Sequence, residues 1–183
     1  MRISLREPFP LLAGGTFLYV GALAGCLAMK AGDILVPAEL LIPLFGLPFL
    51  VLGGRAGWRI ALYVLLLLPA FHWAAVCTTI YSFDWQHSAG WPPGFVGGVT
   101  GALPSFLALA ALRLAKPRPM ALMAGGTLVL ALVGGFGFAY MDFLSDTGWS
   151  QYGLLLSLYV PWQLAFAFLL ARLLRPPEQT DPV

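Results

Sequence analysis

The chain has 183 residues, of which 60% are hydrophobic and only 10% are charged, and its mean hydropathy is +0.85. A water-soluble domain cannot cover that much apolar surface, so the composition excludes an ordinary soluble protein. The net charge of +2 and the lack of a long basic run exclude nucleic acid as a partner.

Six apolar segments follow one another along the chain, and short polar or turn-rich joints separate them. Each has close to the ~20 residues that a helix needs to cross a ~30 Å hydrocarbon core. Because backbone amides in lipid must be paired within the segment, the segments predict an all-α, polytopic transmembrane helix bundle. The expected spans are 9–29, 34–52, 60–80, 94–114, 120–140 and 151–171. They make one membrane domain over residues 1–175, followed by a short polar cytoplasmic tail at 176–183.

The first span contains Leu23-Ala-Gly-Cys26, which matches the lipobox of bacterial lipoprotein signal peptides. The apolar run continues through Met29, so we expect a retained spanning helix with an unmodified Cys26. The alternative is cleavage before Cys26 and attachment of lipid to its thiol.

The second span differs from the others because Pro37, Pro43 and Pro48 interrupt its helical pattern and Glu39 lies within its apolar run. If this segment dips into the membrane and returns, the protein has five spans and a re-entrant segment. The segment is long enough to cross as a helix. Six spans, with both termini in the cytoplasm, is therefore the prediction.

The distribution of basic residues sets this orientation, because Lys and Arg in short loops favour the cytoplasmic side. With the N-terminus inside, nine of the ten Lys and Arg residues face the cytoplasm and only Lys30 faces out. The nine are Arg2, Arg6, Arg55, Arg59, Arg113, Lys116, Arg118, Arg172 and Arg175. We therefore expect a multi-pass protein of a bacterial inner (cytoplasmic) membrane.

Small residues recur at four-residue spacing in several spans, which lets helix backbones approach closely where apolar side chains gain nothing by leaving lipid. The glycines expected at helix contacts are Gly21, Gly25, Gly97, Gly101 and Gly135. Such faces predict a compact bundle, a contact with a second copy of the chain, or a contact with a larger membrane protein. The two cysteines, Cys26 and Cys77, lack the spacing of a metal or redox site, so no metal or cofactor is expected.

Three prolines lie inside predicted spans: Pro69, Pro104 and Pro161. Each leaves a backbone carbonyl unpaired and bends its helix unless a neighbour or a water compensates. Transporters place broken helices of this kind at binding sites near the middle of the membrane. Proline is also common in membrane helices that bind nothing.

Few polar side chains fall deep within the spans, and Glu39 and His72 are the main ionisable ones. A charge near the centre of a membrane helix costs about 2.5–3.5 kcal/mol on insertion scales, so each needs a partner. We predict that both face the bundle interior and that Gln163, beside Trp162, joins them as a substrate-binding residue. A Glu39–His72 pair would make a proton-linked or cation-selective site.

In size, expected span number and placement of the termini, the chain is similar to the membrane substrate-binding subunits of energy-coupling-factor importers. That likeness is one of architecture, which does not by itself assign a function. The sequence favours a permease or a membrane subunit of a transporter for a small solute or ion, and the alternative is a structural or assembly subunit of a larger membrane complex. A third interpretation is an enzyme acting through Asp84 and His87 at the outer face, but no third ligand or triad partner accompanies them.

Overall fold

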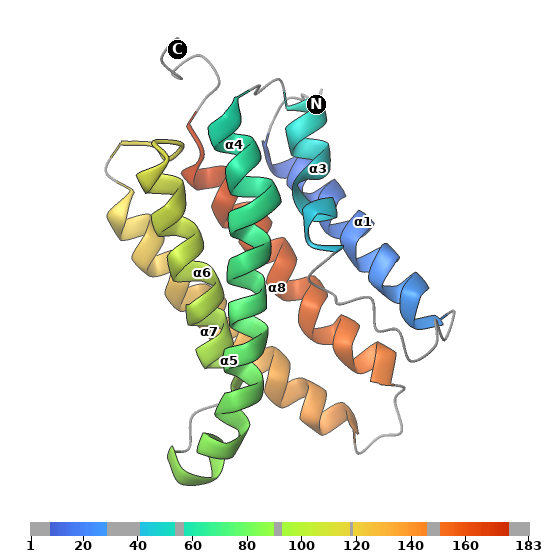
Figure 1. Cartoon of the computed structure of the whole chain (residues 1–183). Helices are drawn as coiled ribbons and strands as arrows, with labels where there is room; N and C mark the ends of the chain where they lie inside the picture. Colours follow the sequence, from blue (N-terminus) through green and yellow to red (C-terminus); the bar gives the residue numbers. More distant parts are fainter. Residues whose placement is uncertain are drawn as a thin grey trace, which may run out of the picture.

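The computed structural model describes residues 8–28, 41–53, 57–89, 93–117, 119–145 and 151–175. In chain order the helices are α1 (Pro8–Ala28), α3 (Pro43–Leu52), α4 (Trp58–Leu62), the π-helical turn η1 (Tyr63–Leu67), α5 (Leu68–Ala89), α6 (Pro93–Ala111), α7 (Met120–Ser145) and α8 (Gln151–Leu173) (Figure 1). Within the described ranges the extended backbone is limited to an isolated bridge between Ala115 and Leu174. The predicted all-α fold class is confirmed.

Four stretches of helix are long and apolar enough to cross a membrane, namely Pro8–Gly25, Trp58–Thr79, Pro93–Ala111 and Met120–Tyr140. The second of these is continuous through α4, η1 and α5. Two further apolar stretches, Pro43–Leu52 and Tyr159–Leu173, are shorter. These helices support a multi-pass helical membrane protein in contact with the lipid bilayer.

The second predicted span is represented in the described part of the chain by α3 alone. This helix has 10 residues, which extend over about 15 Å, or half of a hydrocarbon core. Residues 29–40, with Glu39 among them, lie outside the described residues. Complete crossing by segment 34–52, and with it the count of six spans, stays a prediction.

Two helices extend beyond the spans predicted for them. Helix α5 continues to Ala89 rather than ending near residue 80, and α7 continues to Ser145 rather than ending near residue 140. Neither extension contains glycine or proline, the residues that most often end helices. Polar residues alone, which suggested joints at these places, do not stop a helix.

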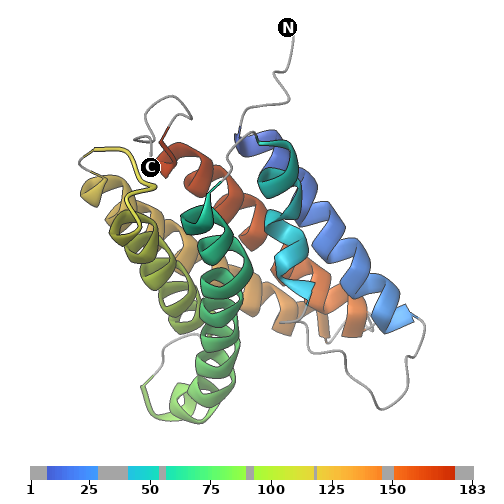
Figure 2. The same cartoon turned by 45° about the horizontal axis from the view of Figure 1, so that its top comes forward.

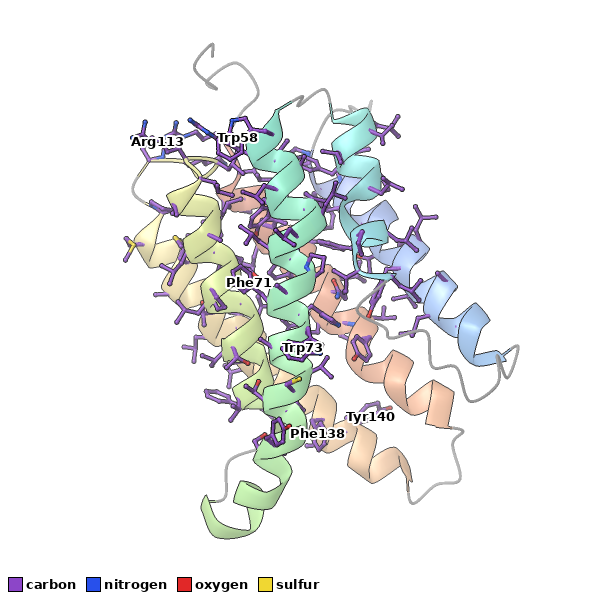
Figure 3. All side chains as sticks on the ribbon, viewed as in Figure 1. Trp58, Phe71, Trp73, Arg113, Phe138 and Tyr140 are labelled. Carbon is purple, nitrogen blue, oxygen red and sulfur yellow. The ribbon has the colours of Figure 1, made fainter. Side chains whose placement is uncertain are left out.

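Successive helices run in opposite directions, so the start of α1 and the end of α8 lie at the same end of the bundle (Figure 1). The basic side chains that the structure describes belong to the helix ends and loops at this end: Arg59, Arg113, Lys116, Arg172 and Arg175. Figure 3 labels Arg113 and Trp58 at this end, with Phe138 and Tyr140 toward the other. The arrangement is the one that the positive-inside rule requires if this end faces the cytoplasm.

Helices α6 and α7 are in backbone contact through small residues. A Cβ atom added to Gly94 would collide with the carbonyl of Gly134, and one added to Gly98 would collide with the backbone of Leu130 and Ala131. Only glycine permits so close an approach. The van der Waals contacts that result hold the helices together, because apolar side chains gain no free energy by leaving lipid.

The glycines predicted from their spacing differ in their surroundings. Gly97 lies against Thr79 and the carbonyl of Ala75 on α5, and Gly101 lies against Ala75 and Trp162. Gly135 is buried, next to the contacting Gly134. Gly21 and Gly25 have open space where a Cβ atom would stand. Their role in packing stays a prediction.

We expect Gly98→Ala and Gly125→Ala to change stability in opposite directions. Gly98→Ala forces backbone apart and should destabilise the protein by about 1–3 kcal/mol. Gly125 has nothing within 4 Å of an added Cβ, so Gly125→Ala should stabilise the protein by up to about 1 kcal/mol through helix propensity. Unfolding of the purified protein in mixed detergent micelles, followed by circular dichroism, measures both. Equal effects would contradict the packing of α6 on α7.

The orientation can be tested with single cysteines in a chain whose Cys26 and Cys77 are replaced by alanine. A membrane-impermeant maleimide added outside intact cells should label His87→Cys and leave Lys116→Cys unlabelled. Labelling of Ala56→Cys from outside would contradict six spans, because position 56 would then follow a segment that enters and leaves on the outer side.

Candidate functional site

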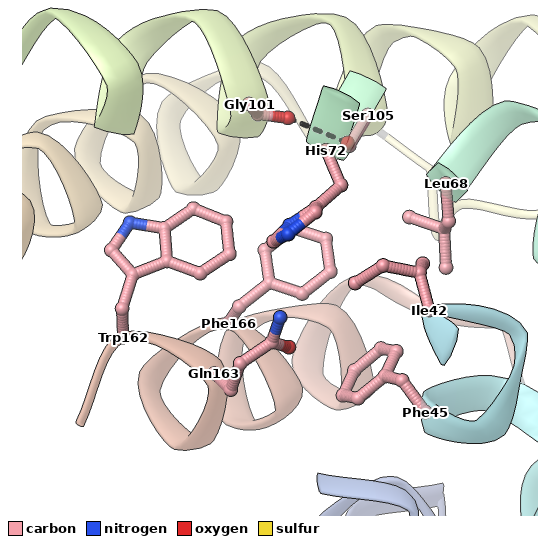
Figure 4. A pocket seen from close by; sticks show the side chains of 9 residues that line it. All are labelled: Ile42, Phe45, Leu68, His72, Gly101, Ser105, Trp162, Gln163 and Phe166. Atoms are coloured by element: carbon pink, nitrogen blue, oxygen red, sulfur yellow. Dashed lines mark hydrogen bonds between the residues drawn. The ribbon is translucent and has the colours of Figure 1, made fainter. Parts of the chain in front are cut away.

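A pocket lies near the middle of the bundle, between α3, α5, α6 and α8 (Figure 4). The cavity has a volume of about 20 Å³ and is partly open to the surroundings. Its lining residues are Ile42, Phe45, Leu68, His72, Gly101, Ser105, Trp162, Gln163 and Phe166. Gln163 lies ten residues before the end of α8 at Leu173, a distance of about 15 Å along the helix axis.

The pocket lies among helices whose contacts form two overlapping groups. Helix α1 packs against both α3 and α8, whereas α6 packs against both α5 and α7. Helix α8 packs against α7 as extensively as against α1, and α3 also contacts η1, so the two groups form one bundle. In Figure 2 the two groups lie side by side. The pocket takes its lining from α3 and α8 in one group and from α5 and α6 in the other.

The structure brings two of the three predicted binding residues together. His72 from α5 and Gln163 from α8 point into the same space from opposite sides (Figure 4). Glu39 lies outside the described residues. It precedes Ile42, which lines the pocket, by three positions in the chain.

Gln163 is buried, with 2% of its surface exposed. Its side-chain amide, which has two donor hydrogens and an acceptor oxygen, has no hydrogen bond to the described residues; it borders the pocket and is not one of the fully enclosed unpaired groups. Leaving a buried polar group unpaired costs about 1–3 kcal/mol. This amide therefore marks the pocket as a place where a polar partner would be stabilised.

The His72 ring is held by two tyrosines. Its Nε2 atom lies 3.5 Å from the hydroxyl oxygen of Tyr19, at the long limit for a hydrogen bond. The ring also packs edge-on against Tyr19, with centroids 6.0 Å apart, and lies at a tilt to Tyr159 with centroids 5.8 Å apart. These contacts fix the imidazole plane and leave its edge toward Gln163.

Ser105 supplies the third polar group of the lining. Its hydroxyl donates to the carbonyl of Gly101 at 2.6 Å, one turn earlier in α6. Since the hydroxyl proton is used, the oxygen offers the pocket its acceptor lone pairs. Beside it, the Trp162 and Phe166 rings stack with centroids 5.3 Å apart and planes 7° apart, forming a flat apolar wall.

Each of the three long helices that line the pocket has a proline beside a lining residue. Leu68 follows the π-helical turn and precedes Pro69, and its N–H bonds to Tyr63, five residues back. Ser105 follows Pro104, and Trp162 follows Pro161. Prolines and π turns interrupt the regular backbone ladder and displace side chains. The pocket thus forms beside a π-helical turn and a proline in α5 and beside prolines in α6 and α8.

Other candidates from the sequence are less well defined. The side chains of Cys26, Asp84 and His87 lie outside the described residues, although α1 continues past position 26 and α5 past position 87. Cys77 is a half-buried free thiol. In the part of the chain that the structure describes, no three His, Cys, Asp or Glu side chains are grouped to hold a metal ion.

Comparison of the chain with protein-family models, with curated proteins and with solved structures gave no match. The likeness to importer subunits noted from architecture therefore finds no support there. The case for a function depends on the geometry of the pocket.

Sequence reasoning missed most of the lining, namely Ser105, Phe166, Ile42, Phe45 and Leu68. Their types are ordinary for a membrane helix, so composition gives no reason to single them out. Adjacency to proline could have identified Ser105 and Leu68, since each stands beside a residue that disturbs its helix.

We expect Gln163→Leu to stabilise the purified protein by about 1–3 kcal/mol, because it removes an unpaired buried amide. Thr100→Val is the matched polar-to-apolar control. It breaks the 2.6 Å hydrogen bond between Thr100 and Thr78 that joins α6 to α5, and should destabilise by about 0.6–1.7 kcal/mol. Detergent unfolding monitored by circular dichroism gives both values. Destabilisation by Gln163→Leu would show instead that the amide is paired in the folded protein.

Proposed function

We propose that the protein is a permease for a small solute or ion in a bacterial inner membrane, acting alone or as the membrane subunit of a transporter. The observation that carries the proposal is the Gln163 amide, buried without a partner among the described residues and facing a pocket shared with His72. A subunit that only packs against others gains nothing from such an amide, since apolar residues would fill the space at lower cost.

The position of the pocket supports transport further. Binding sites of transporters lie near the membrane midplane between two groups of helices that move relative to each other. Here the pocket lies between the α1–α3–α8 group and the α5–α6–α7 group. Helix irregularities at Leu68, Ser105 and Trp162 provide bending points close to the site.

Glu39 remains part of the proposal as a further binding residue. A carboxylate beside His72 and Gln163 would make the site selective for cations or link it to protons. Glu39→Gln removes the charge and keeps the shape, so it separates a charged role from a structural one.

A second candidate function is that of an assembly subunit, and one observation favours it. Gly21 and Gly25 are four residues apart on α1, and the space where their Cβ atoms would stand is open. Such a pair suits close packing against a helix of another protein or a second copy of the chain. Gly21→Leu should then change the size of the complex in mild detergent, as measured by light scattering.

Transport by the purified protein can be tested in vesicles of bacterial lipid. Permeability is measured for water, urea, glycerol, K⁺, Na⁺ and H⁺, with protein-free vesicles as the baseline. We expect at least one of these probes to cross faster with the wild-type protein, and Gln163→Leu to abolish the increase. Thr16→Val, which removes a buried hydroxyl bonded within α1, should leave it intact. If no probe crosses faster, the assembly function becomes the better interpretation.

A further inference from the structure

We infer that the ligand of the pocket is a small neutral molecule with both hydrogen-bond donors and acceptors, such as urea or another small amide. The inference rests on the proposed permease function and names its substrate class. It follows from three properties of the lining, namely its charge, its hydrogen-bonding groups and its shape.

The lining lacks a fixed charge among the residues described. Of its nine members, His72 alone is ionisable, and Gln163 and Ser105 are neutral polar groups. The described basic residues lie at the cytoplasmic end, not at the pocket. An ion taken from water into an apolar interior needs an opposite charge or a full shell of ligands to offset desolvation. A neutral solute avoids that requirement.

The hydrogen-bonding groups of the lining require a ligand that has both hydrogen-bond donors and acceptors. Gln163 offers an acceptor oxygen and a donor NH₂, and His72 in its neutral form has one donor and one acceptor nitrogen. Ser105 offers only its lone pairs, because its proton is bonded to Gly101. A bare cation would leave the Gln163 NH₂ unpaired, and an anion would oppose the Gln163 and Ser105 oxygens. An amide or urea can pair with donors and acceptors together.

The shape of the pocket limits the solute to a small and flat one. Its cavity volume of about 20 Å³ falls far below the ~300–1,000 Å³ typical of sites for larger organic ligands. One wall is the stacked pair of Trp162 and Phe166, with planes 7° apart. Gly101 keeps the tip of the Trp162 ring close to α6, 3.5 Å from where a Cβ would stand. A planar molecule can lie on this wall with its edge toward Gln163 and His72 (Figure 4).

The test compares urea with ions in the same vesicles. Stopped-flow light scattering measures urea entry, and fluorescent indicators inside the vesicles measure K⁺ and H⁺ entry. Wild-type protein should raise urea permeability above that of protein-free vesicles and leave K⁺ and H⁺ permeability at the baseline. Gln163→Leu should lower the protein-dependent urea permeability about tenfold or more, the effect of losing one buried hydrogen bond. Gln163→Asn, which keeps the amide, should retain part of it, and Thr16→Val, whose hydroxyl is bonded within α1 away from the pocket, should leave it unchanged.

If Gln163→Leu does not fold, Ser105→Cys in a chain with Cys26→Ala provides a second measurement. Methyl methanethiosulfonate should block urea entry in that variant, and dithiothreitol should restore it. The matched chain that carries only Cys77 should be unaffected, because Cys77 does not line the pocket.

The outcomes separate the inference from the proposed function. Faster K⁺ or H⁺ entry that is lost in Gln163→Leu would overturn the neutral substrate class and leave the permease proposal standing. Urea entry that is insensitive both to Gln163→Leu and to modification at Ser105→Cys would also overturn the inference, because the solute would then bypass the pocket. If the permeability to every probe equals that of protein-free vesicles, both the inference and the permease proposal are contradicted.

Discussion

The need to pair every polar group inside the apolar bundle governs this structure. Water is absent from a hydrocarbon core, so hydroxyl and amide groups must find partners within the protein. Threonine and serine do so within their own helices: Thr16 donates to the carbonyl of Leu12, and Thr79 to that of Ala75. With its hydroxyl bonded in this way, each of these residues behaves as a small side chain and lets a neighbouring helix approach. Gly97 of α6, for example, lies against Thr79 of α5. Gln163 departs from this rule because its amide reaches beyond its own helix.

The same requirement explains why the pocket lies where the helices are irregular. Close packing between regular helices, as between α6 and α7, leaves no room for a ligand. A proline or a π turn shifts the side chains that follow it and opens the interface locally. A proline stands next to each of Leu68, Ser105 and Trp162, which line the pocket from three helices, and Leu68 also follows the π turn. A gap in the packing lowers the stability of the protein. Its presence beside Gln163 therefore argues that the gap serves to bind a ligand.

The sequence predicted the helical class and most helix positions because long apolar runs in lipid permit one kind of backbone. It failed where the outcome depends on tertiary contacts. The ends of α5 and α7 lie beyond the apolar windows, since hydropathy reports the membrane boundary and not the helix boundary. His72 and Gln163 could be singled out because polar groups are rare at such depth. Ser105 and Phe166 could not, because their importance comes from neighbours on other helices.

Two other polar groups test whether an unpaired atom alone identifies a site. The Tyr63 hydroxyl and the Thr127 hydroxyl are also buried without a hydrogen-bond partner in the described part of the protein. Neither residue lines the pocket. Their oxygen atoms are covered by surrounding atoms, so a solute cannot reach them, and they represent a cost of folding. The Gln163 amide is not one of these enclosed atoms; it borders open space that it shares with His72 and Ser105. The combination of an unpaired group with accessible volume, rather than either alone, makes this pocket the place where binding energy is available.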